Sequence, residues 1–314
     1  MQAVCRVEPT AMASRPEYST RQLFNFAKDS YLERTSRPIY ALIFLLPFIV
    51  FYEMGTVLSN TDALAMTQDR VVAFIWLQSF LDKYLGLGSR FAWVAPPLAV
   101  IVILIGLQLA SRKQWHFGLA DFGPMTIECM LLAVPLIVLS LFLSGPARPQ
   151  RDMVPPGYGA MPGEVLPTCS LLSERSPPVT EPAPKSRDAR SGTLLANIVT
   201  GIGAGIYEEL IFRLVLMCAL MVVLQDLMGL SQKGSVILSV LVSAALFSAH
   251  HHIIFVNGQL ALSSPFSWPE FSFRTIAGVY FAVLFAIRGF GITAGTHAFY
   301  DIIATMVNLL FFGQ

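Results

Sequence analysis

The chain has 314 residues, of which 54% are hydrophobic and only 13% are charged, and its mean hydropathy is +0.61. Soluble globular proteins carry roughly twice that share of charged residues, so the composition predicts a polytopic protein of the lipid bilayer. The formal net charge of +1 gives no support for a nucleic-acid partner, and the widely spaced cysteines argue against a disulfide framework or a zinc knuckle.

The first 38 residues are polar and rich in arginine, and they contain no apolar core of the kind found in signal peptides. A long apolar run, 38–58, follows directly on this basic segment. By the positive-inside rule, this order places the N-terminus in the cytoplasm. We therefore expect an integral protein of the plasma (inner) membrane, with residues 1–38 as a basic cytoplasmic segment.

Residues 39–144 are expected to form a three-span membrane region with one additional helix. The second and third spans are predicted at 91–110 and 125–143, because each run is apolar and long enough to cross a bilayer. Between 62 and 89, apolar residues recur at helical spacing among charged and polar ones. This pattern is typical of a helix in the membrane interface, and a helix packed on the bundle fits it equally well.

The character of the chain changes between residues 145 and 192, where prolines are dense among polar residues. Such a segment cannot hold a helix or a central strand, so we predict a disordered extramembrane linker. The remaining part, 193–314, is expected to form a second helical bundle. Together the two membrane parts predict an all-α transmembrane bundle with about seven to eight spans. The apolar segments of the second bundle are 193–229, 234–255, 271–287 and 292–312.

The first segment of the second bundle carries Glu208, Glu209 and Arg213 at bilayer depth. Charged groups inside a membrane span are costly unless they are paired, so they mark a functional site by default. Glu209 and Arg213 stand at i and i+4 with the acid first, which predicts an ion pair. Glu208 points about 100° around the helix and needs a partner from another helix.

Two other groups of residues bear on how the helices lie. Gly201, Gly203 and Gly205 precede the glutamates, and we expect them to give this helix the slack to tilt or break. Such a bend would bring Glu208 to the depth of polar residues on other spans. Arg288 flanks a span and is expected to snorkel toward the interface.

Histidines on two other apolar segments offer partners to the unpaired glutamate. One segment ends in His250, His251 and His252, and the last segment holds His297 and Asp301 at i and i+4. The second spacing suits shared metal ligation or a paired set of donors to an oxyanion. Polar side chains on three separate spans cost less free energy if they converge, so we expect one common site.

Water activation is the chemistry open to such a set of side chains. A desolvated glutamate can act as a general base, and neutral imidazoles can orient water, donate to an oxyanion or hold a divalent metal. The sequence has no serine in a nucleophile elbow, no HExxH and no phosphate-binding loop. Hydrolysis by an activated water is therefore the expected reaction.

The order of these motifs resembles the CPBP family, which covers CaaX prenyl proteases, bacteriocin-processing proteins and Abi-type intramembrane proteases related to the type II CaaX endopeptidase. The resemblance spans roughly residues 195–312. It rests on Glu-Glu-x-x-x-Arg from Glu208, Phe-x-x-x-His from Phe247 to His251, and His-x-x-x-Asp from His297. It implies an all-helical membrane endopeptidase.

The resemblance also implies a role for each polar residue. Glu208 would be the general base on water, and His251 would place that water. His297 and Asp301 would stabilise the oxyanion. The structural residues of the site would be Glu209, Arg213 and Phe247, with His250 and Tyr300 beside the catalytic side chains.

Metal dependence stays open at this point. The family is often called a metalloprotease family, and His251, His297 and Asp301 would then be the ligands of a divalent ion, zinc. Asp301 stands where the eukaryotic prenyl endopeptidases have asparagine. An ionised aspartate cannot donate to an oxyanion, so this residue favours either metal ligation or a protonated acid.

The predicted function is hydrolysis of a peptide bond in a peptide or membrane-protein substrate. Two other classes of protein also fit. One is a non-catalytic scaffold or regulatory relative, in which the polar cluster only locks helices together. The other is an ion- or proton-coupled transporter, which is less favoured because the chain has no clear internal repeat.

Overall fold

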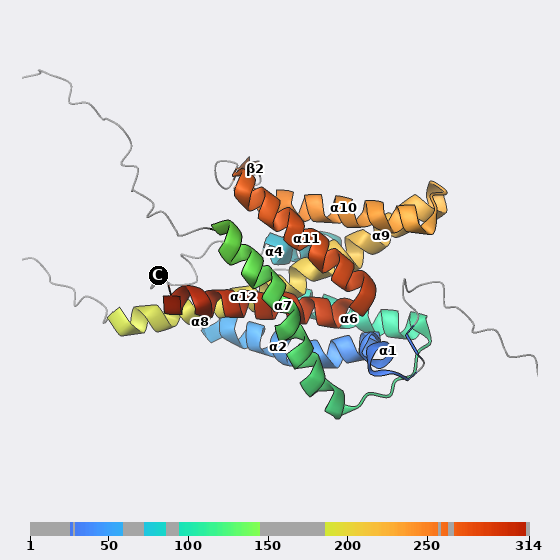
Figure 1. The fold of residues 1–314 in the computed structure, drawn as a ribbon, viewed down its shortest axis with the longest axis horizontal. Helices are drawn as coiled ribbons and strands as arrows, with labels where there is room; N and C mark the ends of the chain where they lie inside the picture. Colours follow the sequence, from blue (N-terminus) through green and yellow to red (C-terminus); the bar gives the residue numbers. More distant parts are fainter. Residues whose placement is uncertain are drawn as a thin grey trace, which may run out of the picture.

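The computed structural model describes residues 26–27, 29–58, 72–85, 94–144, 186–256, 259–262 and 267–311 (Figure 1). Most of the predicted basic N-terminal segment and most of the predicted proline-rich linker lie outside these residues. The helix that follows the linker begins at Ser186, before the expected end of the linker at residue 192.

Helices form nearly all of the described chain, which confirms the all-α prediction; a short hairpin of two strands is the exception. The N-terminal elements are α1 (Tyr31–Thr35), α2 (Pro38–Leu58), α4 (Val72–Leu85), α6 (Ala95–Ser111), a 3₁₀ turn (Leu119–Asp121) and α7 (Phe122–Ser144). The C-terminal elements are α8 (Ser186–Glu209), a π-helical segment (Leu210–Met217), α9 (Cys218–Met221), a second π-helical segment (Val222–Leu227), α10 (Gln232–His250), β1 (Ile253–Val256), β2 (Gln259–Leu262), α11 (Trp268–Arg288) and α12 (Phe290–Phe311).

Five helical stretches in the described ranges are long and apolar enough to cross a membrane. Helix α6 is apolar but shorter. An integral membrane protein with several spans is therefore confirmed, whereas a count of seven to eight spans stays a prediction. The five stretches are Pro38–Thr56, Leu119–Leu143, Leu194–Leu227, Gln232–His250 and Trp268–Arg288.

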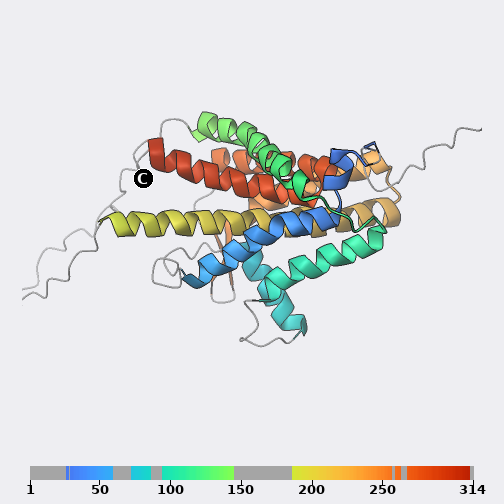
Figure 2. The same cartoon turned by 90° about the horizontal axis from the view of Figure 1, so that it is seen from below.

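Helix α8 lies between α2 and α12, and these three helices run roughly along the long axis of the molecule (Figure 2). Helices α10 and α11 pack on one another, and α7 crosses α12 obliquely (Figure 1). The main core fills the space where α2, α8 and α12 meet, with the rings of Tyr40, Phe44 and Tyr207 among its buried members.

The glycines of α8 set the distance to its neighbours. A Cβ atom at Gly205 would lie 2.6 Å from the backbone nitrogen of Ala298 in α12, and one at Gly201 would lie 2.6 Å from Cβ of Asp301. Gly203 faces α2 just as closely. The expectation that the helix breaks at these glycines is wrong, because α8 continues through them as an α-helix, whereas a tilt of the whole helix stays a prediction. They allow close approach of neighbouring helices instead.

Arg288 is buried at the end of α11 and does not snorkel, with only 5% of its surface exposed. Its Nη2 atom donates to Glu128 Oε2 of α7 at 2.8 Å and to Thr35 Oγ1 of α1 at 2.9 Å. The expectation of snorkelling is wrong because a carboxylate far away in the sequence supplies a buried partner. This network ties α1, α7 and α11 together.

Helix α4 packs on the bundle through one face. Ala73 and Phe74 are buried, and the Phe74 ring meets the rings of Tyr52 in α2 and Tyr207 in α8 at centroid distances of 5.8 and 5.0 Å. Of the two arrangements that the sequence allows for this helix, packing on the bundle is therefore present. The opposite face stays exposed.

Candidate active site

The two glutamates stand at the junction where α8 passes into a π-helical segment at Leu210. Both are buried, with 5% of Glu208 and none of Glu209 exposed. They lie near the middle of the candidate span Leu194–Leu227, far from either end of this apolar stretch. Such groups need partners there, and neighbouring helices provide them.

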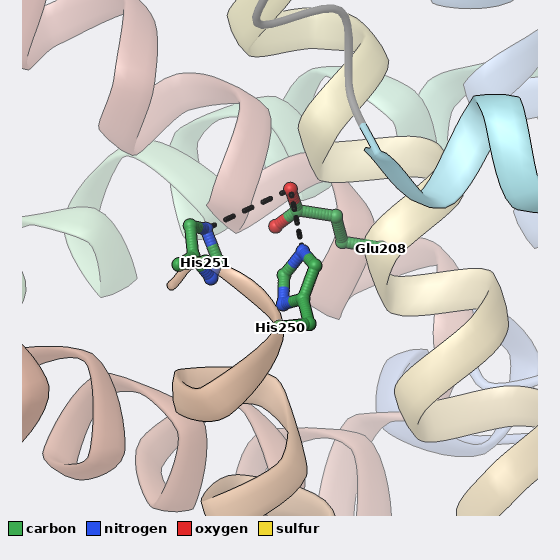
Figure 3. Close-up of side chains that lie close together, drawn as sticks. All are labelled: Glu208, His250 and His251. Atoms are coloured by element: carbon green, nitrogen blue, oxygen red, sulfur yellow. Dashed lines mark ion pairs between the residues drawn. The ribbon is translucent and has the colours of Figure 1, made fainter. Parts of the chain in front are cut away.

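Glu208 faces the C-terminal end of α10 (Figure 3). Its Oε1 atom lies 3.7 Å from Nε2 of His250 and 3.8 Å from Nε2 of His251. Its other oxygen, Oε2, lies 4.0 Å from Nε2 of His297 in α12. All three distances exceed the length of a hydrogen bond, and they leave room for a shared small species between the groups.

The backbone fixes which nitrogen of each α10 imidazole faces Glu208. Nδ1 of His250 donates to the carbonyl oxygen of Phe247 at 2.6 Å, and Nδ1 of His251 donates to the same oxygen at 2.9 Å. A carbonyl can only accept, so Nδ1 carries the proton in both rings. In the neutral state each Nε2 atom therefore presents a lone pair to the carboxylate.

Three acceptor atoms thus converge on one point. The ligating atoms of Glu208, His250 and His251 lie within 4.8 Å of one another. With the protons on Nδ1, the Nε2 atoms of the neutral imidazoles cannot donate to the carboxylate, so this arrangement suits a donor placed between them. A water molecule, a shared proton or a divalent cation has the required character.

Glu209 joins two helices at the back of the site. Its Oε2 atom lies 3.1 Å from Nε of Arg213, and its Oε1 atom accepts from Nδ1 of His297 at 2.7 Å. The ion pair expected from the spacing of Glu209 and Arg213 is present. Its second bond, to α12, gives no signal in the sequence. Because Nδ1 of His297 is bound there, its Nε2 atom faces Glu208.

Arg213 is fully buried, and aromatic faces hold it in addition to the carboxylate. Its guanidinium carbon lies 4.2 Å from the centroid of the Phe247 ring, a cation–π distance. Nη2 donates to the carbonyl oxygen of Gly278 in α11 at 3.2 Å. Phe247 therefore serves the site twice, with its ring on Arg213 and its carbonyl oxygen on the two histidines.

Asp301 lies next to His297 on the same side of α12. Its Oδ2 atom is 3.6 Å from Nε2 of His297, and its Cβ atom rests against Gly201. Tyr300, by contrast, packs with the cluster around Phe281, and its ring meets the Phe273 ring in a tilted arrangement. The Phe281 ring in turn lies parallel to the His297 ring at 4.5 Å.

The structure thus gathers the residues that the sequence analysis singled out on α8, α10 and α12. The metal-ligand set, however, differs from the expected one: among the described residues it comprises Glu208, His250 and His251. Of the expected ligands His251, His297 and Asp301, only His251 belongs to it. His250 lies as near to Glu208 as His251 does, because His250 is the last residue of α10 and His251 is its C-cap.

Comparison with known proteins agrees with this geometry. Residues 190–303 match the model of the family described as Type II CAAX prenyl endopeptidase Rce1-like. No curated protein and no solved structure matches the chain. The matched region contains most of α8, all of α10 and α11, and most of α12, and hence every polar residue of the site. The C-terminal part of the chain is therefore similar to the Rce1-like type II CAAX prenyl endopeptidases, consistent with the CPBP family that its motif order resembles.

Proposed function

We propose that the protein is an intramembrane endopeptidase that hydrolyses a peptide bond by attack of an activated water. The observation that carries this proposal is the position of Glu208, whose carboxylate faces three imidazoles at 3.7–4.0 Å. The family match supports the class of reaction. A peptide or a membrane protein would be the substrate, cleaved where its chain reaches the bilayer interior.

In this proposal Glu208 is the general base. A water held between Glu208 Oε1 and the Nε2 atoms of His250 and His251 would donate one hydrogen to the carboxylate and another to an imidazole. Its lone pair would then be free to attack the scissile carbonyl carbon, while the proton passes to Glu208 and later to the leaving amine. Base catalysis of this kind accelerates a reaction by about 10²–10⁴-fold.

His297 and Asp301 would act on the carbonyl oxygen as it gains charge. His297 can donate from Nε2 only as an imidazolium, and Glu209 at its Nδ1 atom stabilises that charged form. Asp301 can donate only when it is protonated. Glu209 and Arg213 would orient His297 from behind and would not touch the substrate.

The same residues also suit a metal ion. Two imidazoles and one carboxylate with an open fourth position are the donors that catalytic zinc sites use. Glu208, His250 and His251 would hold the ion, which when bound would lower the pKa of a water molecule. One carboxylate cannot be both a ligand and the general base, and Glu209 is already bound by Arg213 and His297. We therefore favour Glu208 as the base.

Replacement of Glu208 by glutamine tests the proposal. Glutamine keeps the shape of the side chain but cannot take a proton, so we expect peptide cleavage by the purified full chain in lipid vesicles to fall by about 10²–10⁴-fold. Glu53→Gln is the matched control, because Glu53 is also a partly buried acid on a membrane helix but contacts Tyr207 instead of the histidines. A non-catalytic scaffold would show the same result for both variants, namely no cleavage above background.

The basic segment before the first span bears on how the chain is oriented in its membrane. We propose that the N-terminus lies in the cytoplasm and that the protein resides in the plasma (inner) membrane, since arginines precede the first span. The proline-rich region would link an N-terminal membrane region to the catalytic bundle.

A further inference from the structure

We propose that Trp76 of α4 forms a wall of the substrate site and binds a bulky apolar side chain next to the scissile bond. This inference rests on the proposed endopeptidase function and adds a specificity residue to it. Trp76 lies outside residues 190–303, so the family match carries no information about it. The contacts of α4 carry the inference.

The first observation is the contact between Trp76 and the site. The Trp76 ring meets the ring of His250 edge-on, with centroids 6.1 Å apart. His250 in turn faces Glu208 at 3.7 Å. Trp76 is partly exposed, whereas His250 is buried, so part of the indole stays uncovered while its ring borders a histidine of the site.

The second observation is that Glu208's own helix fixes the position of α4. Phe74 packs edge-on against Tyr207, the residue before Glu208, with ring centroids 5.0 Å apart. Ala73, in the same turn, is fully buried. In Figure 3, α4 is the cyan ribbon on the Glu208 side of the site. Trp76 is therefore held at a defined place relative to the proposed base.

The third observation is an aromatic row that leads away from the site. Trp76, Phe80 and Tyr84 stand at i, i+4 and i+8, and so lie along one side of α4. Phe80 and Tyr84 are exposed and pack on each other at 4.6 Å. Trp76 is the member of this row that touches a site residue, which separates its role from that of the other two rings.

The geometry of peptide cleavage connects these observations to a ligand. For attack by a water at Glu208, the scissile carbonyl must come within about 3–3.5 Å of that water. Side chains on either side of the bond then follow within one residue spacing, about 3.8 Å along the backbone. A side chain at that spacing can reach the ring that borders His250. An indole face favours an apolar or aromatic side chain there.

Trp76→Ala tests the subsite with a synthetic peptide library that is randomised on both sides of its centre, and products are identified by mass spectrometry. Removal of the indole takes away the apolar surface that the large side chain would contact. We expect the ratio of kcat/KM for a peptide with a large aromatic side chain to that for a peptide with alanine to fall by about tenfold or more. Trp76→Phe should give a smaller change in the same direction, and it keeps an aromatic ring for folding.

Phe80→Ala is the matched control, because it removes an aromatic ring of the same row that contacts Tyr84 and not His250. Its side-chain preference should equal that of the unaltered chain. If the unaltered chain cleaves peptides and the Trp76 variants keep its side-chain preference, the subsite proposal alone is overturned. The indole would then face lipid. Absence of any cleavage by the unaltered chain would overturn the proposed function, and the subsite with it.

Discussion

His297 Nδ1 and Glu209 Oε1 lie 2.7 Å apart, so the acid that neutralises Arg213 also orients a histidine of the site. The two residues are far apart in the sequence, since α8 is the first helix of the C-terminal bundle and α12 is the last. One carboxylate therefore links a buried charge to the proposed chemistry.

This link predicts the behaviour of a double-mutant cycle at Glu209 and Arg213. Glu209→Gln leaves a fully buried guanidinium without its counter-charge, so we expect it to cost about 3–5 kcal/mol of stability. Arg213→Met in the Glu209→Gln background removes that charge and should restore much of the thermal stability in detergent. Cleavage should stay low in the double variant, because His297 still lacks its carboxylate. Recovery of full activity would show that Glu209 serves Arg213 alone.

Gly205 gives a prediction about helix spacing. Alanine at this position places a Cβ atom 2.6 Å from the backbone of Ala298, so α8 and α12 must separate. We expect a loss of about 1–3 kcal/mol in stability and a fall in cleavage, as the Glu209–His297 bond lengthens. Gly106→Ala in α6 is the control, because a Cβ there meets nothing within 4 Å. Equal melting temperatures for the two variants would contradict the close approach.

Asp301 gives a prediction about pH. As a donor to the oxyanion it must be protonated, so its contribution is present below its pKa in the site and is lost as the pH rises through that pKa. The amide of Asp301→Asn donates at every pH, so this variant should stay active and extend cleavage to higher pH. Asp301→Leu should lose about 10²–10³-fold in kcat. If Asp301→Asn and Asp301→Leu are both inactive, the reaction depends on the ionised carboxylate of Asp301 instead.

Chelation separates the two ways of activating water at Glu208. With Glu208 as the base, cleavage should survive a strong, membrane-permeable chelator of zinc. If cleavage is lost on chelation and restored by zinc, then Glu208, His250 and His251 are ligands, and His250→Ala should lower the zinc content of the purified protein. His252→Ala is a control for that measurement, since His252 is outside the ligand set.

The parts of the site that sequence could predict are those set by spacing along one helix. Glu209 and Arg213 at i and i+4 form the expected pair, and His297 and Asp301 share one side of α12. The need of Glu208 for a partner follows from the cost of a bare carboxylate in lipid, and its partners are indeed histidines from other helices. Hydropathy likewise located the apolar helices.

Contacts between distant segments could not be predicted in this way. The histidine run left it open which imidazole faces Glu208, and the answer depends on where α10 ends and on one carbonyl, that of Phe247. Arg288 was expected at the interface because its partner Glu128 lies in a different part of the chain. The glycines of α8 indicate a helix surface without side chains. The residues that pack closely against that surface belong to α2 and α12, and the sequence does not identify them.

The π-helical segment at Leu210–Met217 begins directly after the two glutamates. The hydrogen bonds of a π-helix span five residues instead of the four of an α-helix. The segment therefore fits an additional residue into the helix. Everything downstream on this helix is thereby rotated relative to Glu208. Removal of a single residue after Arg213 would leave the Glu209–Arg213 spacing intact but would turn the side chains that follow, among them the buried Met217, about 100° around the helix. The length of this stretch is therefore constrained as well as the identity of its charged residues.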